Sequence, residues 1–206
     1  MLAKPMLLLP VLVAVLGLTV PLAGGSLRGL GNLRLRALWL IWLALAVQVA
    51  VFTVVPEGSP SAHAAAYLGT YGLGLAFLAV NRRVPGMLVI GIGAALNLAA
   101  IVANGGQMPA LPSALEAAGL EPEPGGFTNS VAAEGAPLWF LGDVFAVPWP
   151  WFLANVFSVG DVVIALGAAY GVHRVCGSRA AAAVARVARR VQPSRRRSRK
   201  ARTTSR

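Results

Sequence analysis

Long apolar runs constrain this chain more than any other feature of its sequence. Five of them approach or exceed the ~18 to 20 residues that a helix needs to cross ~30 Å of hydrocarbon. Because lipid cannot hydrogen-bond the backbone, runs that cross a membrane should be helical. A composition that is 57% hydrophobic and only 12% charged agrees with this interpretation. The five predicted spans cover residues 6–22, 37–55, 64–80, 84–102 and 151–172.

We therefore predict an all-α fold, a polytopic transmembrane bundle of about five spans over residues 1–172. An extracytoplasmic loop over residues 103–150 is expected to cap it, and residues 173–206 form a basic cytoplasmic tail. The first run could instead be a signal peptide, because Lys4 precedes an apolar stretch that ends in small residues. No good cleavage site follows that stretch, which favours a span.

The basic residues predict the orientation of the bundle. The first and third connections and the tail carry 17 of the 18 Lys and Arg residues, whereas the second and fourth connections carry none. Since Lys and Arg are retained on the cytoplasmic side, the N-terminus should lie outside and the C-terminus inside. Basic residues of the two inner connections are Arg28, Arg34, Arg36, Arg82 and Arg83.

The outer loop is expected to contain some structure. Ser113 with Glu116 three residues later has the spacing of a capping box, and Gly119 would end the short helix. The segment 137–152 is too short to span the bilayer and too apolar for water, so we expect an interfacial or re-entrant piece. Residues 121–135 are expected to form a solvated loop.

Polar residues from separate spans are expected at one depth. Gln48, Asn97 and Asp161 each lie near the middle of a predicted span, as do Thr70 and Tyr71. A central Asp costs about 2.5 to 3.5 kcal/mol on insertion scales, so these groups should face inward and bond one another. A narrow seam of small side chains on the fifth span should let another helix approach. This seam comprises Ala154, Ser158, Asp161, Ala165 and Ala168.

Three interpretations of Asp161 remain open. It could be a structural clasp between helices, the centre of a binding or proton-handling site, or part of an enzyme. The sequence SVGD at Ser158 to Asp161 is one residue away from the GxGD pattern of intramembrane aspartyl proteases, which need two aspartates. Asp143 is the only other aspartate, so an aspartyl-type hydrolase would need the segment around Asp143 to fold back into the membrane.

Metal and cofactor sites are not predicted. The chain has a single cysteine, Cys176, and its two histidines, His63 and His173, are far apart in the sequence. These residues are too few for a cysteine or histidine metal centre. The expected bundle therefore has no cofactor and no catalytic site that the sequence can name.

Three short motifs, in this order, resemble an uncharacterised bacterial membrane family known as domain of unknown function 5317. They are NGGQMP after the fourth span, LGD in the outer loop and FSVGD in the last span. VPLAGG after the first span and Gln48 also resemble the family's pattern. The resemblance covers about residues 5–172 and implies a multi-spanning protein of the bacterial inner membrane, without a reaction or partner. The outer-face motif residues are Asn104, Gly105, Gly106, Met108, Pro109 and Asp143.

Gly105 and Gly106 have two possible roles. They could form a turn that directs backbone amides at a ligand, or they could simply end the fourth helix, which is the favoured interpretation.

The tail is expected to be a surface helix followed by a polybasic end. Anionic headgroups attract such residues by ~1 kcal/mol each, which makes the bilayer the expected partner. A simple topology signal is an alternative. Nucleic acid is a weaker one, because the tail has no aromatic residues to stack on bases. The basic residues are Arg186, Arg189, Arg190, Arg195, Arg196 and Arg197.

The orientation can be tested with reporter fusions at Gly125 and at Arg206. We expect a periplasmic reading at Gly125 and a cytoplasmic reading at Arg206, because basic residues are absent from the fourth connection and concentrated in the tail. Fusions that report the same side would refute the predicted number of spans.

Overall fold

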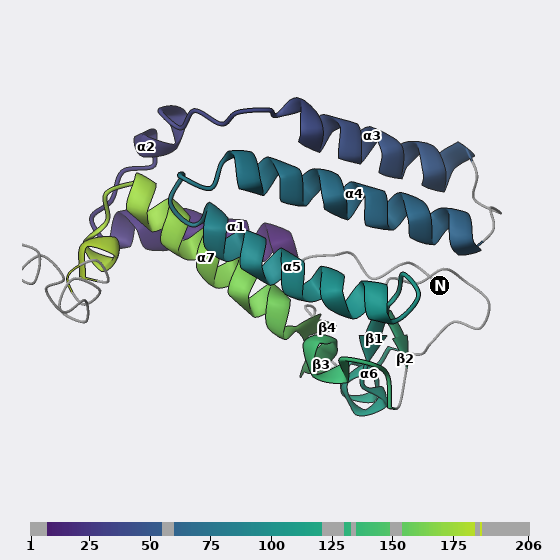
Figure 1. Cartoon of the computed structure of the whole chain (residues 1–206). Coiled ribbons are helices and arrows are strands. Elements are labelled where there is room, and N and C mark those ends of the chain that lie inside the picture. Colours follow the sequence, from purple (N-terminus) through teal and green to yellow (C-terminus); the bar gives the residue numbers. More distant parts are fainter. Residues whose placement is uncertain are drawn as a thin grey trace, which may run out of the picture.

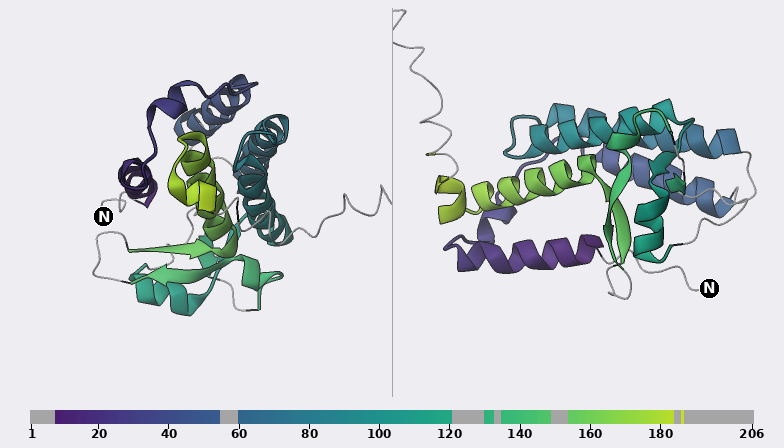
Figure 2. Two further views of the ribbon diagram at one scale, coloured as in Figure 1. Left: turned by 90° about the vertical axis from the view of Figure 1, so that its left-hand side faces the viewer. Right: turned by 90° about the horizontal axis from the view of Figure 1, so that it is seen from below.

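The computed structural model describes residues 8–54, 60–120, 130–132, 135–148, 154–183 and 186. Over these residues the protein is mostly helical, with a small sheet beside the helices (Figure 1). The long helices run side by side, and the strands run across their direction (Figure 2). The helices are α1 (Leu8–Leu22), α2 (Arg28–Gly31), α3 (Trp39–Val54), α4 (Pro60–Val80), α5 (Met87–Ala103), α6 (Pro112–Ala118) and α7 (Val159–Val175).

The first four predicted spans each coincide with one long helix, but the fifth does not. Within the predicted run 151–172, Asn155–Ser158 is a strand (β4), and α7 begins only at Val159. Asp161 therefore lies in the first turn of α7 rather than near the middle of a span. The physical reason is local, because the Ser158 side chain accepts a hydrogen bond from the backbone of Asp161 and so starts the helix there.

The expectation of an all-α fold is wrong for the outer loop. It contributes β1 (Met108–Ala110), β2 (Ser130–Ala132) and β3 (Asp143–Val147), which form a sheet with β4 in the order β2-β1-β3-β4. β1 pairs in parallel with β2 and β3, and β3 pairs antiparallel with β4. Strands of three to five residues are too short to show a clear alternating pattern in the sequence.

The short helix expected after residue 110 is present, but its start differs from the prediction. α6 begins at Pro112, its N-cap is Leu111, and no side chain caps it, so the expected capping box of Ser113 and Glu116 is wrong. Proline suits the first turn because its missing N–H would be unbonded there. Gly119 ends the helix in a left-handed conformation, as predicted.

The segment 137–152, expected to be interfacial or re-entrant, begins with a single 3-10 turn, η1 (Trp139–Leu141), and continues into β3. The middle of the outer loop, residues 121–129, lies outside the described residues.

Helix length limits how the apolar runs can be interpreted. Among the described residues, Ala62–Val80 is the one helical stretch that is both long and apolar enough to cross a bilayer. The helical stretches Val11–Leu22, Trp39–Val51 and Met87–Ala103 are apolar but shorter. Five full-length spans are therefore not supported, although an apolar helix occupies each of the first four predicted positions.

Glycines let α5 and α7 approach closely. A Cβ atom on Gly93 would lie 2.5 Å from the Gly160 carbonyl oxygen, and one on Gly160 would overlap the side-chain oxygen of Asn97. The α7 residues that let the backbones approach are Gly160, Gly167 and Gly171, all buried. Of the predicted seam, Ser158 and Asp161 also contact α5, through the Asn97 side chain.

Substitution of Gly93 or Gly160 by alanine should destabilise the protein by about 1 to 3 kcal/mol, since overpacking forces the helices apart. The matched control is Gly91→Ala on the same helix, where the nearest atom to the new Cβ is 3.8 Å away. That control should be neutral or stabilising, because alanine favours helix. Thermal unfolding in detergent, followed by circular dichroism, measures the difference. Equal melting temperatures for all three variants would contradict the close contact.

Candidate functional site

Polar side chains from four helices meet partway along the bundle, and we call them the polar cluster: Gln48, Thr70, Tyr71, Asn97, Ser158 and Asp161. Gln48 on α3 donates from Nε2 to Thr70 Oγ1 on α4 over 3.3 Å. Thr70, which is buried, in turn donates to the carbonyl of Tyr67 over 2.8 Å. Gln48 therefore bonds Thr70 on α4, and Asp161 has a different hydrogen-bond partner.

Asn97 on α5 is the centre of the cluster. Its side chain is 3% exposed, and its Nδ2 donates to Asp161 Oδ1 over 2.8 Å. Its Oδ1 accepts from Ser158 Oγ, also over 2.8 Å. We expected Gln48, Asn97 and Asp161 to bond one another, and the partner that Asp161 takes is Asn97, at the start of α7.

Ser158 and Asp161 cap α7 reciprocally. The Asp161 backbone N–H donates to Ser158 Oγ, and the Ser158 backbone N–H donates to Asp161 Oδ2, each over 3.0 Å. Both carboxylate oxygens accept hydrogen bonds, which suits an acidic group in the first turn of a helix. A Ser followed by Asp three residues later is a visible sequence signal for this cap, and the sequence interpretation of SVGD missed it.

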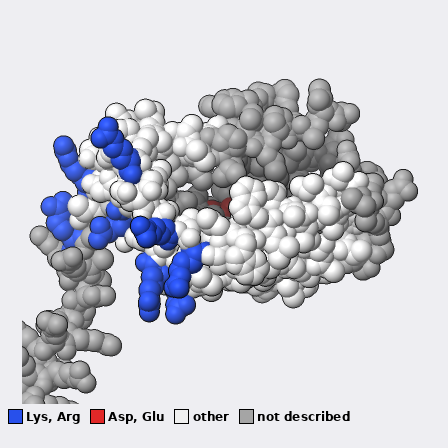
Figure 3. Space-filling model, turned by 90° about the horizontal axis from the view of Figure 1, so that it is seen from above, with Lys and Arg blue, Asp and Glu red and all other residues white. Residues whose placement is uncertain are grey.

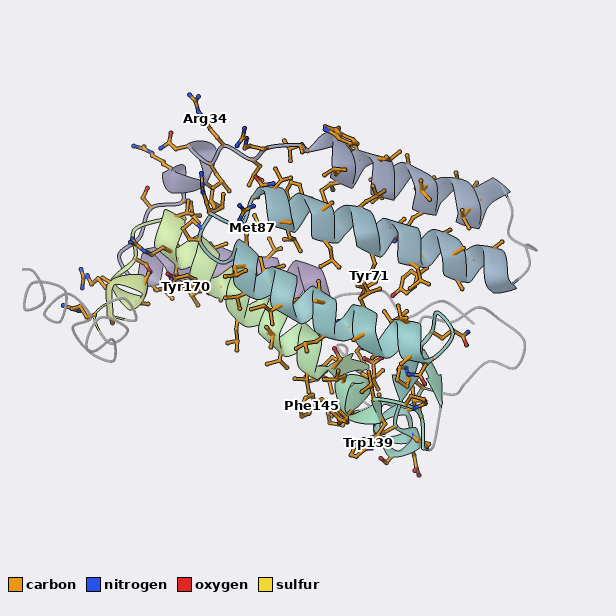
Figure 4. The ribbon with its side chains drawn as sticks, in the orientation of Figure 1. Arg34, Tyr71, Met87, Trp139, Phe145 and Tyr170 are labelled. Atoms are coloured by element: carbon orange, nitrogen blue, oxygen red, sulfur yellow. The ribbon has the colours of Figure 1, made fainter. Side chains whose placement is uncertain are left out.

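Two tyrosines form the α4 side of the cluster. Tyr71 is directed from α4 toward α5 (Figure 4), and its hydroxyl lies near Tyr67 and Asn97. The two rings pack edge to face with centroids 5.2 Å apart. Both rings also pack on the buried core formed by Ala100, Ile101 and Met108. The hydroxyl groups are thus held between an apolar core and the polar cluster.

Asp143 reaches the same neighbourhood through the sheet. It is the first residue of β3, it is buried, and its Cα is paired with that of Ser158. The two aspartates, 18 residues apart in sequence, are therefore brought to the same region of the fold. Asp161, however, is accounted for by its cap and its bond to Asn97, and nothing in these contacts favours the aspartyl-type hydrolase.

The NGGQMP motif forms the junction between α5 and the sheet. Asn104 Nδ2 donates to the carbonyls of Ala100 and Pro137, both over 2.8 Å. Gly105 and Gly106 have positive φ angles, and the Gly106 N–H bonds the Ile101 carbonyl, so these glycines end α5. Met108 and Pro109 follow as buried residues of β1.

Other predicted residues lie elsewhere. His173 bridges α1 and the residues after α7, with Nε2 3.3 Å from Thr19 Oγ1 and Nδ1 2.9 Å from Ser178 Oγ.

In the described part of the chain, no three His, Cys, Asp or Glu residues are grouped as metal ligands. Arg186 is exposed, and the remaining tail arginines, Arg189, Arg190, Arg195, Arg196 and Arg197, lie outside the described residues.

Comparison with known proteins gives a family without an assigned activity. An uncharacterised protein from Thermotoga maritima is 33% identical over 91 residues, which cover 44% of this chain and 52% of the relative. The chain thus spans about half the length of this curated relative. No solved structure matches the chain significantly. The sequence profile described as "Family of unknown function (DUF5317)" matches residues 32–172 and includes every member of the polar cluster. The chain therefore belongs to the DUF5317 family.

Proposed function

We propose that this protein is a membrane-embedded binding or accessory protein of the cytoplasmic membrane, with the polar cluster as its binding centre. Its chemical role would be to hold a cation or a proton near Asp161. This proposal has two parts, a location and a site, and different observations support them.

Exposed apolar side chains support the location. Leu18 on α1, Trp42 on α3, Leu88 on α5 and Leu166 on α7 are each more than 60% exposed. Soluble monomers rarely leave contiguous apolar surface of this kind in water. The described arginines gather at one end of the molecule (Figure 3), as expected for the cytoplasmic end of a bundle with its N-terminus outside.

The single observation that carries the site is the buried Asn97 side chain on α5, which bonds both Asp161 and Ser158 at the start of α7. Gln48 on α3 and Thr70 on α4 form a separate hydrogen-bonded pair. α7 starts at this level, partway along the bundle (Figure 2). Membrane transporters place binding sites where a helix is interrupted at mid-depth, which is the arrangement proposed here.

The chemistry of the cluster favours a positively charged or proton-donating ligand. Asp161 is the acidic member, the Ser158, Thr70 and tyrosine hydroxyls supply further acceptor oxygens, and no Lys or Arg belongs to the cluster. Carboxylates inside a membrane usually pair with a cation or mark an ion or proton pathway. The competing interpretation is a clasp that only joins α5 and α7.

Substitutions at Asp161 separate the hydrogen bonds from the charge. Asp161→Leu leaves the Ser158 N–H and the Asn97 amide without acceptors, which should cost about 2 to 5 kcal/mol. Asp161→Asn should cost less, roughly 1 to 2 kcal/mol, because its amide oxygen can still accept from the Ser158 N–H, while only the hydrogen bonds around the Asn97 amide must rearrange. Thermal unfolding in detergent tests this order. Equal destabilisation by both variants would contradict the geometry.

A ligand screen tests the binding role. The melting temperature of the full-length protein is measured with sodium, potassium, ammonium and simple primary amines, and over a range of pH. A ligand at about 100 times its dissociation constant adds roughly 2.7 kcal/mol, or about 5 to 10 °C for a chain of this size. The shift should disappear in Asp161→Asn.

The control for this screen is Glu116→Gln, which removes one negative charge from an exposed position on α6. It should keep the full shift. If no cation or pH change stabilises the wild type more than Asp161→Asn, the cluster is only a clasp and the proposed binding role is wrong.

A further inference from the structure

A buried asparagine holds the backbone at the opposite end of the molecule from the sheet. Asn81, just after α4, is 3% exposed. Its Oδ1 accepts from the Arg36 N–H over 2.8 Å, and its Nδ2 donates to the Arg36 carbonyl over 2.9 Å. Nδ2 also donates to the Phe77 carbonyl on α4 over 2.9 Å. One side chain thus fixes the segment before α3 against the end of α4.

The backbone of the residue after Arg36 is strained. Ala37 has a φ angle of 54°, in the left-handed region that residues other than glycine avoid. Strained backbone persists only where surrounding contacts impose it, and such positions cluster at functional sites. The Asn81 side chain bonds both backbone groups of Arg36, the residue directly before Ala37.

This geometry holds two pairs of arginines on adjoining segments of backbone. Arg36 is the residue held by Asn81, with Arg34 two positions earlier, while Arg82 and Arg83 directly follow Asn81. All four side chains are exposed, and Arg34 extends away from the bundle (Figure 4). The described acidic residues, Glu116, Asp143 and Asp161, lie on α6, β3 and α7. Arg82 Nη1 donates to the Ala79 carbonyl over 3.1 Å, and none of the described acidic residues lies on these two segments to neutralise the arginine pairs.

We propose that Arg34, Arg36, Arg82 and Arg83, which we name the arginine corner, form a binding site for a phosphate group. Guanidinium groups bind phosphate through paired N–H donors, and several of them around one anion offset their mutual repulsion. A bound phosphate would explain why the strained backbone at Ala37 and the buried Asn81 side chain are retained, since the Asn81 contacts hold the two arginine pairs on adjoining segments. This site is separate from the polar cluster and does not depend on the cation proposed there.

The phosphate could belong to a lipid headgroup or to a soluble phosphate ester. Trp39 and Trp42, in the first turn of α3, are 63% and 68% exposed beside the corner. Exposed tryptophans are typical of the membrane–water interface, where they lie at the level of the headgroups. The lipid source is therefore the favoured one, and the experiment includes a soluble arm.

The test uses the full-length protein in detergent and counts bound molecules by native mass spectrometry. One arm titrates phosphatidylglycerol, with phosphatidylcholine as the zwitterionic comparison, and the other titrates inorganic phosphate. The double variant Arg82→Gln with Arg83→Gln should weaken phosphatidylglycerol binding roughly 30-fold. This follows because each arginine contributes about 1 kcal/mol of attraction to an anionic headgroup. Binding of the lipid alone identifies a headgroup site, and binding of inorganic phosphate identifies a site for soluble esters.

Two further variants separate a built site from general positive charge. Asn81→Ala removes the clamp without changing the charge, and it should weaken binding at least tenfold. Arg28→Gln with Arg174→Gln removes the same charge as the first pair from exposed positions on α2 and α7, and it should leave binding unchanged. If Asn81→Ala does not fold, Arg34→Gln with Arg36→Gln takes its place and must weaken binding. Wild-type affinity in Asn81→Ala would overturn the proposal. So would an equal loss of binding in the control pair, Arg28→Gln with Arg174→Gln, and in Arg82→Gln with Arg83→Gln.

Discussion

Ser158 is joined to three parts of the fold at once, and the start of α7 depends on it. Its hydroxyl donates to Asn97 on α5 and accepts from the backbone of Asp161, while its own N–H donates to the Asp161 carboxylate. The same residue ends β4 and pairs with Asp143 of β3. Because it is fully buried, loss of its hydroxyl would remove the partner of one donor, the Asp161 N–H, and of one acceptor, the Asn97 Oδ1. The strand, the helix and the polar cluster therefore share one residue.

The close contact of α5 with α7 follows from the same arrangement. Gly160 comes two residues after Ser158, and its missing side chain leaves the space that the Asn97 amide occupies. Small residues elsewhere on α7 keep the two backbones close along the length of the contact. A larger residue at this position would separate Asn97 from Asp161 and would disturb packing and site together.

The two ends of the bundle differ in chemistry as well as in charge. One end carries the sheet and α6 (Figure 1), and the other carries the loops with exposed arginines (Figure 3). The polar cluster lies between them, and Asn81 stabilises the arginine end by holding the backbone of Arg36. Each region has its own buried amide side chain, Asn97 or Asn81, that joins segments distant in sequence. A buried amide serves this purpose because it donates and accepts at once.

The sequence by itself determined the positions of α1, α3, α4 and α5, because long apolar runs are a strong and local signal. It also indicated that polar groups in separate apolar runs should bond one another, but not that Asn97 would be the partner of Asp161. The tertiary structure decided that residues 155–158 form a strand, because β4 needs β3 as a partner, whereas the start of α7 at Val159 follows from the local cap of Ser158 and Asp161. It likewise decided that Gln48 binds Thr70 and that Asp143 lies beside Ser158. Those pairings depend on how helices and strands are placed relative to each other, and residue type and spacing along one chain do not specify that placement.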